Sequence, residues 1–313
     1  MGLGGTSTNP NPYPGNVFLT YNNPATKKGF SYNTAITIDK AFRNGWALNF
    51  SWAFGNSLVY NELTSSQNNS QWRFMETVNG KNFVQRTISD FDMGHRFVGY
   101  LSKKFNYFNK RMATTITFTY NGQQGNPFSY VYGSSIIGDD GRGSTNDLIY
   151  IPTQADLAQQ TFTNVTVNGV VYTVAQQKQL LEEYIQRNKY LRKRRGQFAE
   201  RNGDRLPWAH VIDMSIRQDF NIKMGKKTYQ IQLTYDVYNF TNMLNRNWGQ
   251  TYFLSNDQYG LIRFTGFAPS PAPNFTPSYQ FTPQTGKPWG VSTSNIPGIS
   301  ARYIGQIGIR LSF

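Results

Sequence analysis

The sequence has no cysteine and only two histidines, His95 and His210. Without cysteine, disulfide scaffolds, cysteine-ligated zinc and thiol nucleophiles are excluded. Two histidines far apart in the chain leave almost no material for a histidine metal site or a Ser-His-Asp triad, and we expect both to lie at strand ends. No pair of carboxylates occupies a recognisable catalytic setting. The sequence therefore predicts no enzyme, no metal site and no cofactor.

Charge and long apolar runs are also scarce. Charged residues make up 15% of the 313 residues, against about 25% in an average soluble domain. No window reaches the ~20 apolar residues of a membrane-spanning helix, so a helical transporter or receptor is excluded. Aromatic residues, in contrast, reach 16%, which is far too many for a disordered chain. The charge that is present is unbalanced, because 31 Lys+Arg against 17 Asp+Glu give a net charge of +14.

Apolar and polar residues alternate with period two over long stretches of the chain. In residues 46–60, for example, Trp46 and Leu48 fall on one face, and Ala47 and Asn49 fall on the other. Such alternation predicts β-strands with one buried or lipid-facing side. An Asn-Gly pair at positions 44 and 45 predicts a hairpin turn. The pattern predicts seven strands, at residues 30–42, 46–60, 95–105, 112–122, 210–220, 229–240 and 301–313.

The third of these strands, 95–105, is ambiguous, because either Phe97 and Leu101 or Val98 and Tyr100 could face outward. All seven segments are at least eleven residues long, whereas strands of soluble proteins cluster near about 5–6 residues. Charged and amide side chains occupy the middle of the polar face, and aromatic residues mark the ends of the apolar stripes. These features favour a transmembrane β-barrel over a soluble β-sandwich.

The connections between the predicted strands alternate in length. Short turns on one side and long loops on the other are typical of outer-membrane barrels, whose long loops are extracellular and whose short turns are periplasmic. This order also predicts that Phe313 ends at the periplasmic side. A helix is predicted at 175–195, stopped by Gly196, and the proline-rich segment 268–288 is predicted to be irregular. The short links are 43–45, 106–111 and 221–228, and the long ones are 61–94, 131–208 and 241–299.

Several segments resemble the Oar-like TonB-dependent outer-membrane receptors. They occur in order over roughly the last 220 residues, at 92–96 (DMGHR), 146–152 (NDLIYIP), 201–208 (RNGDRLPW), 213–220 (DMSIRQDF) and 238–242 (YNFTN). The C-terminal strand is similar to the terminal signal by which the barrel-assembly machinery recognises bacterial barrels, and the residues that carry this similarity are Gln306, Gly308, Leu311 and Phe313.

The resemblance implies an all-β chain whose antiparallel strands form part of a transmembrane barrel. Residues 1–313 would supply about seven strands, the C-terminal third of a 22-stranded barrel, with long extracellular loops of which one contains a helix. The family imports a bulky nutrient with energy from the TonB system, acting through a plug domain that is absent from this chain. We therefore expect an outer-membrane location and outer-membrane lipid and lipopolysaccharide as partners. We also expect Met1 to be an internal methionine of a longer gene or the start of a truncated reading frame. The long loops would contact the ligand. Four tryptophans are candidates for stacking on it, and for each the alternative is ordinary packing in the loop core: Trp72, Trp208, Trp248 and Trp289.

Two other functions remain open from the sequence. The first is a structural or adhesive surface barrel without transport, and the second is a soluble basic β-protein that binds polyanions. The basic run 189–195 favours contact with lipopolysaccharide over nucleic acid, since no base-stacking pattern accompanies it. The segment 138–147 has oxygen ligands and glycines but lacks the spacing and terminal Glu of a calcium loop, so a glycine-rich turn is favoured.

Overall fold

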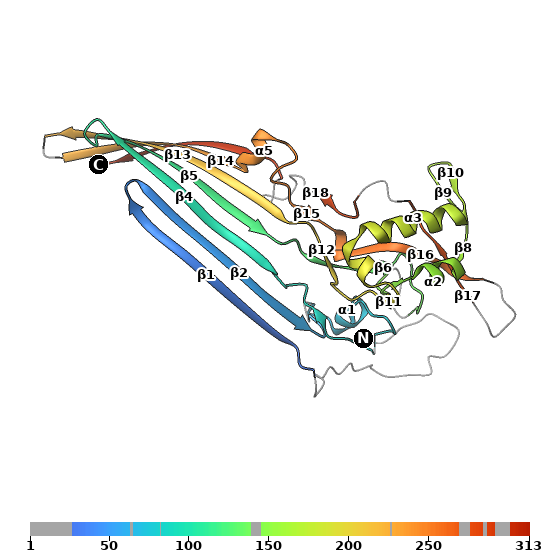
Figure 1. Cartoon of the computed structure of the whole chain (residues 1–313). Helices are drawn as coiled ribbons and strands as arrows, with labels where there is room; N and C mark the ends of the chain where they lie inside the picture. Colours follow the sequence, from blue (N-terminus) through green and yellow to red (C-terminus); the bar gives the residue numbers. More distant parts are fainter. Residues whose placement is uncertain are drawn as a thin grey trace.

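The computed structural model describes residues 27–62, 65–81, 83–138, 145–225, 227–268, 276–283, 287–291 and 301–313. Its dominant feature is one long antiparallel sheet, which we call the long sheet (Figure 1). All seven strands predicted by alternation are present in it, in the order of the sequence, with the two-residue β3 (Thr87–Ile88) beside β2. The seven strands are β1 (Phe30–Arg43), β2 (Trp46–Val59), β4 (His95–Tyr107), β5 (Met112–Gln123), β13 (Ala209–Met224), β14 (Lys227–Tyr238) and β19 (Ile304–Ser312).

The short connections are tight turns that need particular residues. Asn44 and Gly45 have φ angles of 54° and 77°, which are the positive values of the predicted Asn-Gly hairpin turn. A Cβ atom at Gly45 would lie 2.4 Å from the Lys104 carbonyl oxygen, so only glycine fits there. The β13–β14 turn contains Gly225, at φ 62°.

Strand pairing resolves the ambiguous third strand. Phe97 lies opposite Trp52, and Leu101 lies opposite Leu48. Residues that are directly opposite in an antiparallel pair project from the same face of the sheet. Phe97 and Leu101 therefore share the apolar face of β2, and Val98 belongs to the polar face.

The two ends of the long sheet differ. The three hairpin turns and the C-terminal end of β19 lie together at one end, whereas the long connections leave from the other (Figure 1). The predicted alternation of short and long connections is confirmed. We call these the turn end and the loop end.

The long connections pack into a second body beyond the loop end, which we call the loop layer (Figure 1). Its central sheet has five strands in the order β12-β6-β16-β17-β8, and two of its pairings are parallel. The elements in these connections are α1 (Asn68–Arg73), β6 (Pro127–Tyr132), β7 (Tyr150–Ile151), α2 (Gln154–Gln159), β8 (Thr161–Phe162), β9 (Val165–Val167), β10 (Val170–Tyr172), α3 (Val174–Arg187), α4 (Lys189–Lys193), β11 (Gln197–Phe198), β12 (Asp204–Arg205), α5 (Phe240–Leu244), β15 (Tyr252–Phe253), η1 (Ser255–Asp257), β16 (Gln258–Ala268), β17 (Thr276–Gln280) and β18 (Gly290–Val291).

One prediction about the loop layer, that the segment 268–288 is irregular, is wrong in part. Part of the proline-rich segment 268–288, predicted to be irregular, forms the regular strand β17, which pairs with β16 on one side and β8 on the other. The physical reason is burial: the side chains of Tyr279 and Phe281 enter the core, and their apolar area outweighs the local preference of the prolines.

The predicted helix at 175–195 forms, but in two pieces. Asn188 leaves the helical conformation with φ −92° and ψ 121°, and its side chain caps α4 by accepting a hydrogen bond from the Leu191 N–H at 2.8 Å. The predicted stop at Gly196 has a positive φ of 76°. Leu181, Ile185 and Leu191 of the predicted apolar stripe are fully buried. Among the described residues, no helix combines the length and apolar character needed to cross a membrane.

Candidate functional site

One face of the long sheet carries large apolar side chains that remain exposed. Ile307 is 82% exposed and Ile309 is 70% exposed, although both lie in regular strand pairing with β14. A contiguous apolar surface of this kind marks an interface with lipid or with another apolar body. The exposed members of this face include Tyr32, Ile36, Ile38, Trp46, Leu48, Phe50, Leu101, Phe105, Phe118, Leu233, Tyr235, Ile307, Ile309 and Leu311.

A row of stacked rings crosses the apolar face at the loop end. Ring centroids are 6.1 Å apart between Trp52 and Phe97, 5.9 Å between Phe97 and Trp208, and 5.9 Å between Trp208 and His210. The indole N–H of Trp52 donates to Nδ1 of His95 at 3.3 Å. Both histidines lie at strand ends, as predicted, and they provide polar atoms at the border of an apolar surface.

The opposite face of the long sheet is polar, and its groups bond to one another across strands. Asn49 donates to Asp39 at 3.0 Å, and Gln232 donates to Asp219 at 2.7 Å. Asp219 is buried, and without the Gln232 amide its carboxylate would destabilise the sheet. The two faces therefore have opposite chemical character over the full width of the sheet.

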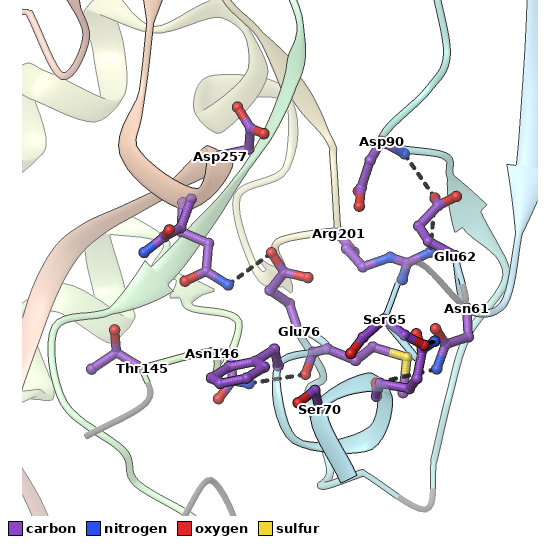
Figure 2. Close-up of a pocket in the computed structure, with 15 residues that line it drawn as sticks. Asn61, Glu62, Ser65, Ser70, Glu76, Asp90, Thr145, Asn146, Arg201 and Asp257 are labelled. Carbon is purple, nitrogen blue, oxygen red and sulfur yellow. Dashed lines mark hydrogen bonds and ion pairs between the residues drawn. The ribbon is translucent and has the colours of Figure 1, made fainter. Parts of the chain in front are cut away.

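A polar cleft of about 420 Å³ lies where the three long connections meet (Figure 2). Each connection contributes side chains, so the cleft exists only when all three are folded. Its lining residues are Asn61, Glu62, Ser65, Ser70, Gln71, Phe74, Met75, Glu76, Asp90, Thr145, Asn146, Arg201, Asn256, Asp257 and Gln258.

Arg201 and Glu62 form one wall of this cleft, with the guanidinium directed toward the carboxylate (Figure 2). An Nη2 atom of Arg201 lies 3.9 Å from Oε1 of Glu62, and both side chains are buried. Glu62 is held by the Ser89 hydroxyl at 3.0 Å and by the Asp90 N–H at 2.7 Å. The Nε atom of Arg201 donates to the Thr87 hydroxyl at 2.9 Å. Both side chains are therefore fixed before any ligand arrives.

Burial changes the acidity of two carboxyl groups in the cleft. It raises the pKa of Glu76, and a hydrogen bond from Gln258 at 3.0 Å offsets this only in part. Burial also raises the pKa of Asp257, with a smaller contribution from the negative charge of Asp90. A neutral carboxyl group donates a hydrogen bond as well as accepting one. With charge of both signs, hydroxyls and amides, the cleft suits hydrogen bonding to a polar ligand.

The four tryptophans proposed as ligand contacts do not form one site. Trp208 and Trp248 lie together in a pocket of about 240 Å³, and Trp248 is 54% exposed. Trp289 packs against the core of the loop layer with Lys287 above its ring at 5.7 Å. Trp72 belongs to α1, and its buried Nε1 has no hydrogen-bond partner within the described residues. Ligand contact at any of the four stays a prediction.

Sequence reasoning did not identify the cleft residues as a group. They come from three segments that are distant in sequence, and no spacing rule relates Glu62, Glu76 and Asp257. The one available signal was the resemblance, because Asn146 begins the NDLIYIP segment and Arg201 begins the RNGDRLPW segment.

Two charged segments singled out in the sequence have structural partners. In the basic run, Arg195 pairs with Glu182 at 2.6 Å and Arg194 pairs with Glu200 at 2.8 Å. Asp147 of the calcium-like segment accepts hydrogen bonds through Oδ2 from the backbone N–H groups of Ile136 and Ile137, at 2.6 Å and 3.1 Å. Residues 139–144 of that segment lie outside the described residues. Among the described residues, no group of three His, Asp or Glu side chains could hold a metal ion.

Of the residues that resemble a barrel-assembly signal, three lie on β19 and Phe313 directly follows it. Gln306 is opposite Asp236, Gly308 is opposite Thr234 and Leu311 is opposite Ile231. A Cβ atom at Gly308 would lie 2.6 Å from the Thr234 hydroxyl oxygen, so close packing against Thr234 favours glycine at this position. Phe313 is 98% exposed at the turn end. Recognition by the assembly machinery stays a prediction.

Comparison with protein-family models, curated proteins and solved structures finds no match to this chain.

Proposed function

We propose that the long sheet is part of the wall of an outer-membrane β-barrel of the TonB-dependent receptor type. The observation that carries this proposal is the exposed apolar face, which is bordered by a row of stacked rings and backed by a hydrogen-bonded polar face. A transmembrane barrel has this arrangement, with an apolar band against lipid, aromatic girdles at both borders and a polar interior.

The dimensions of the apolar face support this proposal. On β2 the uninterrupted apolar positions run from Trp46 to Phe54, a stretch of nine residues. This agrees with the about 9–11 residues that a β-strand tilted by about 45° needs to cross the hydrocarbon.

The edges of the long sheet also bear on the proposal. Within the described residues, β1 pairs only with β2, and β19 pairs only with β14. In hydrocarbon each unpaired backbone group costs several kcal/mol, so a sheet in a membrane must close. In the proposed assembly, both edge strands pair with further strands of a complete barrel.

The loop layer then faces the cell exterior, and the polar cleft of Glu62, Glu76 and Arg201 contributes ligand contacts. Uptake of a bulky nutrient would be driven by the TonB system through a plug domain. This part of the proposal rests on the resemblance of the sequence motifs and on the meeting of all three long connections in one cleft.

Reconstitution tests the membrane assignment. The full chain, purified in detergent, is mixed with phosphatidylcholine vesicles, and the detergent is removed. We expect copies of the chain to pair through their open edges, to float with the vesicles in a density gradient and to resist a carbonate wash. A chain that stays monodisperse without detergent or lipid would overturn the assignment and favour the soluble polyanion-binding protein.

A second experiment separates uptake from the alternative, a structural or adhesive surface barrel. Cross-linking in intact cells of the native host should join the chain, through its plug-bearing assembly, to TonB. If the chain is recovered from the outer membrane without any TonB adduct, under conditions in which another receptor of the same cells yields one, the structural alternative stands.

A further inference from the structure

The charged residues of the long sheet are distributed unevenly over its two faces. At the turn end, four cations project from the apolar face. Lys40 is opposite Leu48, Arg43 is opposite Trp46, Lys103 is also opposite Trp46, and Lys227 is opposite Met224. These four residues, which we call the basic rim, alternate with aromatic and aliphatic side chains.

None of the acidic residues in the seven described long strands lies on that face. Each of the four acids in the seven long strands lies on the polar face, opposite a polar or small residue of the neighbouring strand. Two of them, Asp39 and Asp219, lie in the half of the sheet nearer the turn end. Both are engaged there by the amide groups of Asn49 and Gln232. The four acids are Asp39, Asp213, Asp219 and Asp236.

At the loop end of the same face, the seven described long strands carry no lysine or arginine. Their polar groups there include the Asn56 amide, opposite Tyr32, and the imidazoles of His95 and His210, within the row of stacked rings. Arg86, whose guanidinium lies 5.6 Å from the centre of the Phe30 ring, comes from a long connection instead of a strand. The apolar face is therefore cationic at one border and aromatic at the other.

Lys103 shows how a cation is held at this border. Its ammonium group lies 4.6 Å from the centre of the Trp46 ring and 5.6 Å from that of Phe105, and it donates to the Asn44 carbonyl oxygen at 3.1 Å. The alkyl stem covers the apolar surface while the charge points to the turn. This is the snorkelling geometry of lysines at the edge of a membrane.

We propose that the basic rim binds the phosphate groups of anionic phospholipids in the leaflet at the turn end. The inference rests on the proposed membrane function and adds a lipid partner of defined charge on one side. Exposed Lys110, Arg111 and Lys223 surround the rim and increase the positive potential there. A lysine or arginine near an anionic membrane surface strengthens binding by about fivefold.

The test uses the full chain and two charge-matched triple variants. The rim variant carries Lys40→Gln, Arg43→Gln and Lys227→Gln, and keeps Lys103 because that side chain packs on two rings. The control variant carries Arg96→Gln, Lys104→Gln and Arg310→Gln, which remove the same charge from the polar face of the same sheet. Flotation is measured with phosphatidylcholine vesicles, with and without phosphatidylglycerol, at low and high salt.

We expect phosphatidylglycerol to increase the bound fraction of the wild-type chain and of the control variant. In the rim variant this increase in binding should be smaller by about fivefold for each cation removed, up to about a hundredfold at low salt. High salt should reduce the difference between the rim variant and the wild-type chain. All three proteins should bind neutral vesicles equally, which separates this test from the proposed membrane function. An unchanged phosphatidylglycerol effect in the rim variant, or an equal loss in the control variant, would overturn the proposal.

Discussion

The long sheet and the loop layer contain similar apolar side chains and place them in opposite environments. In the loop layer, Phe128, Tyr130 and Leu181 are completely buried by other parts of the same chain. In the long sheet, Ile307 and Ile309 project from a regular strand with no covering element among the described residues. The loop layer is therefore stabilised by its own packing, whereas the apolar face of the long sheet gains no such packing from the described part of the chain.

The largest effect is expected where the loop layer depends on its own core. Leu181→Ala removes a fully buried side chain from α3 and leaves a cavity, so the free energy of unfolding of this region should fall by about 2–5 kcal/mol. Ile309→Ala in the long sheet should cost less, because lipid or detergent fills the space and no cavity forms. Denaturant unfolding in detergent, followed by hydrogen exchange in each region, measures both. Equal losses would show that the sheet face is packed against protein after all.

Charge placed on the two faces of the long sheet should have a large and one-sided effect in a bilayer. Ile216 lies on the apolar face opposite Ile116, and Ile216→Arg should lower the free energy of unfolding from lipid vesicles by about 2–4 kcal/mol. Phe50→Arg on β2 should behave in the same way. Ser51→Asn and Ser215→Asn, on the polar face, should be nearly silent. A larger loss from the serine variants than from the arginine variants would reverse the assignment of the faces.

Two hairpin glycines give a smaller and more finely matched comparison. Gly45 in the long sheet and Gly169 in the loop layer both have positive φ, at 77° and 81°. Gly169→Ala meets open space, so only the backbone preference opposes it, at roughly 1–2 kcal/mol. Gly45→Ala adds a clash with the Lys104 carbonyl oxygen and should lower the thermal midpoint further. If Gly45→Ala is the milder change, the turn is not as tight as described.

The smallest effect is expected at an exposed helix cap of the loop layer. Hydrogen bonds from Tyr150 at 2.7 Å and from Thr153 lower the pKa of Asp156, whose carboxylate completes the capping box of α2. A lowered folded-state pKa contributes stability that is present above the unfolded-state pKa and is lost as the pH falls through the folded-state value. Asp156→Asn should therefore lower the thermal midpoint slightly near neutral pH, and the difference should vanish in acid. A difference that persists in acid would assign the effect to altered packing instead of charge.

Local sequence patterns predicted the long strands, in which apolar and polar side chains alternate. They did not predict the contacts between segments that are distant in sequence. The alternation of Trp46, Leu48 and Phe50 identified β2, because a strand's two faces follow directly from residue parity. The face on which Phe97 lies could be assigned only from its partner Trp52 on the neighbouring strand. Strand pairing is not contained in the alternation of a single strand.

The structure of the loop layer could not be predicted from the sequence for a related reason. The parallel pairing of β6 with β16 joins residues more than a hundred positions apart, and the cleft combines Glu62, Arg201 and Gln258 from three connections. Neither leaves a periodic trace in the sequence. The division of the predicted helix at Asn188 depends on the Tyr130 hydroxyl and the Asp204 carboxylate, to which the Asn188 amide donates at 2.9 Å and 3.1 Å.

The pairing of β5 with β13 has a kinetic consequence. These strands are adjacent in the long sheet, but the whole connection from Gln123 to Ala209 separates them in the chain. Closing so long a loop costs entropy before any contact is gained, and pairings of this kind slow folding. The loop layer shortens the effective distance, since the Leu206 N–H donates to the Asn126 carbonyl oxygen at 3.0 Å and β12 pairs with β6. Folding of the loop layer should therefore precede the joining of the two halves of the long sheet, and a destabilised loop layer should delay it.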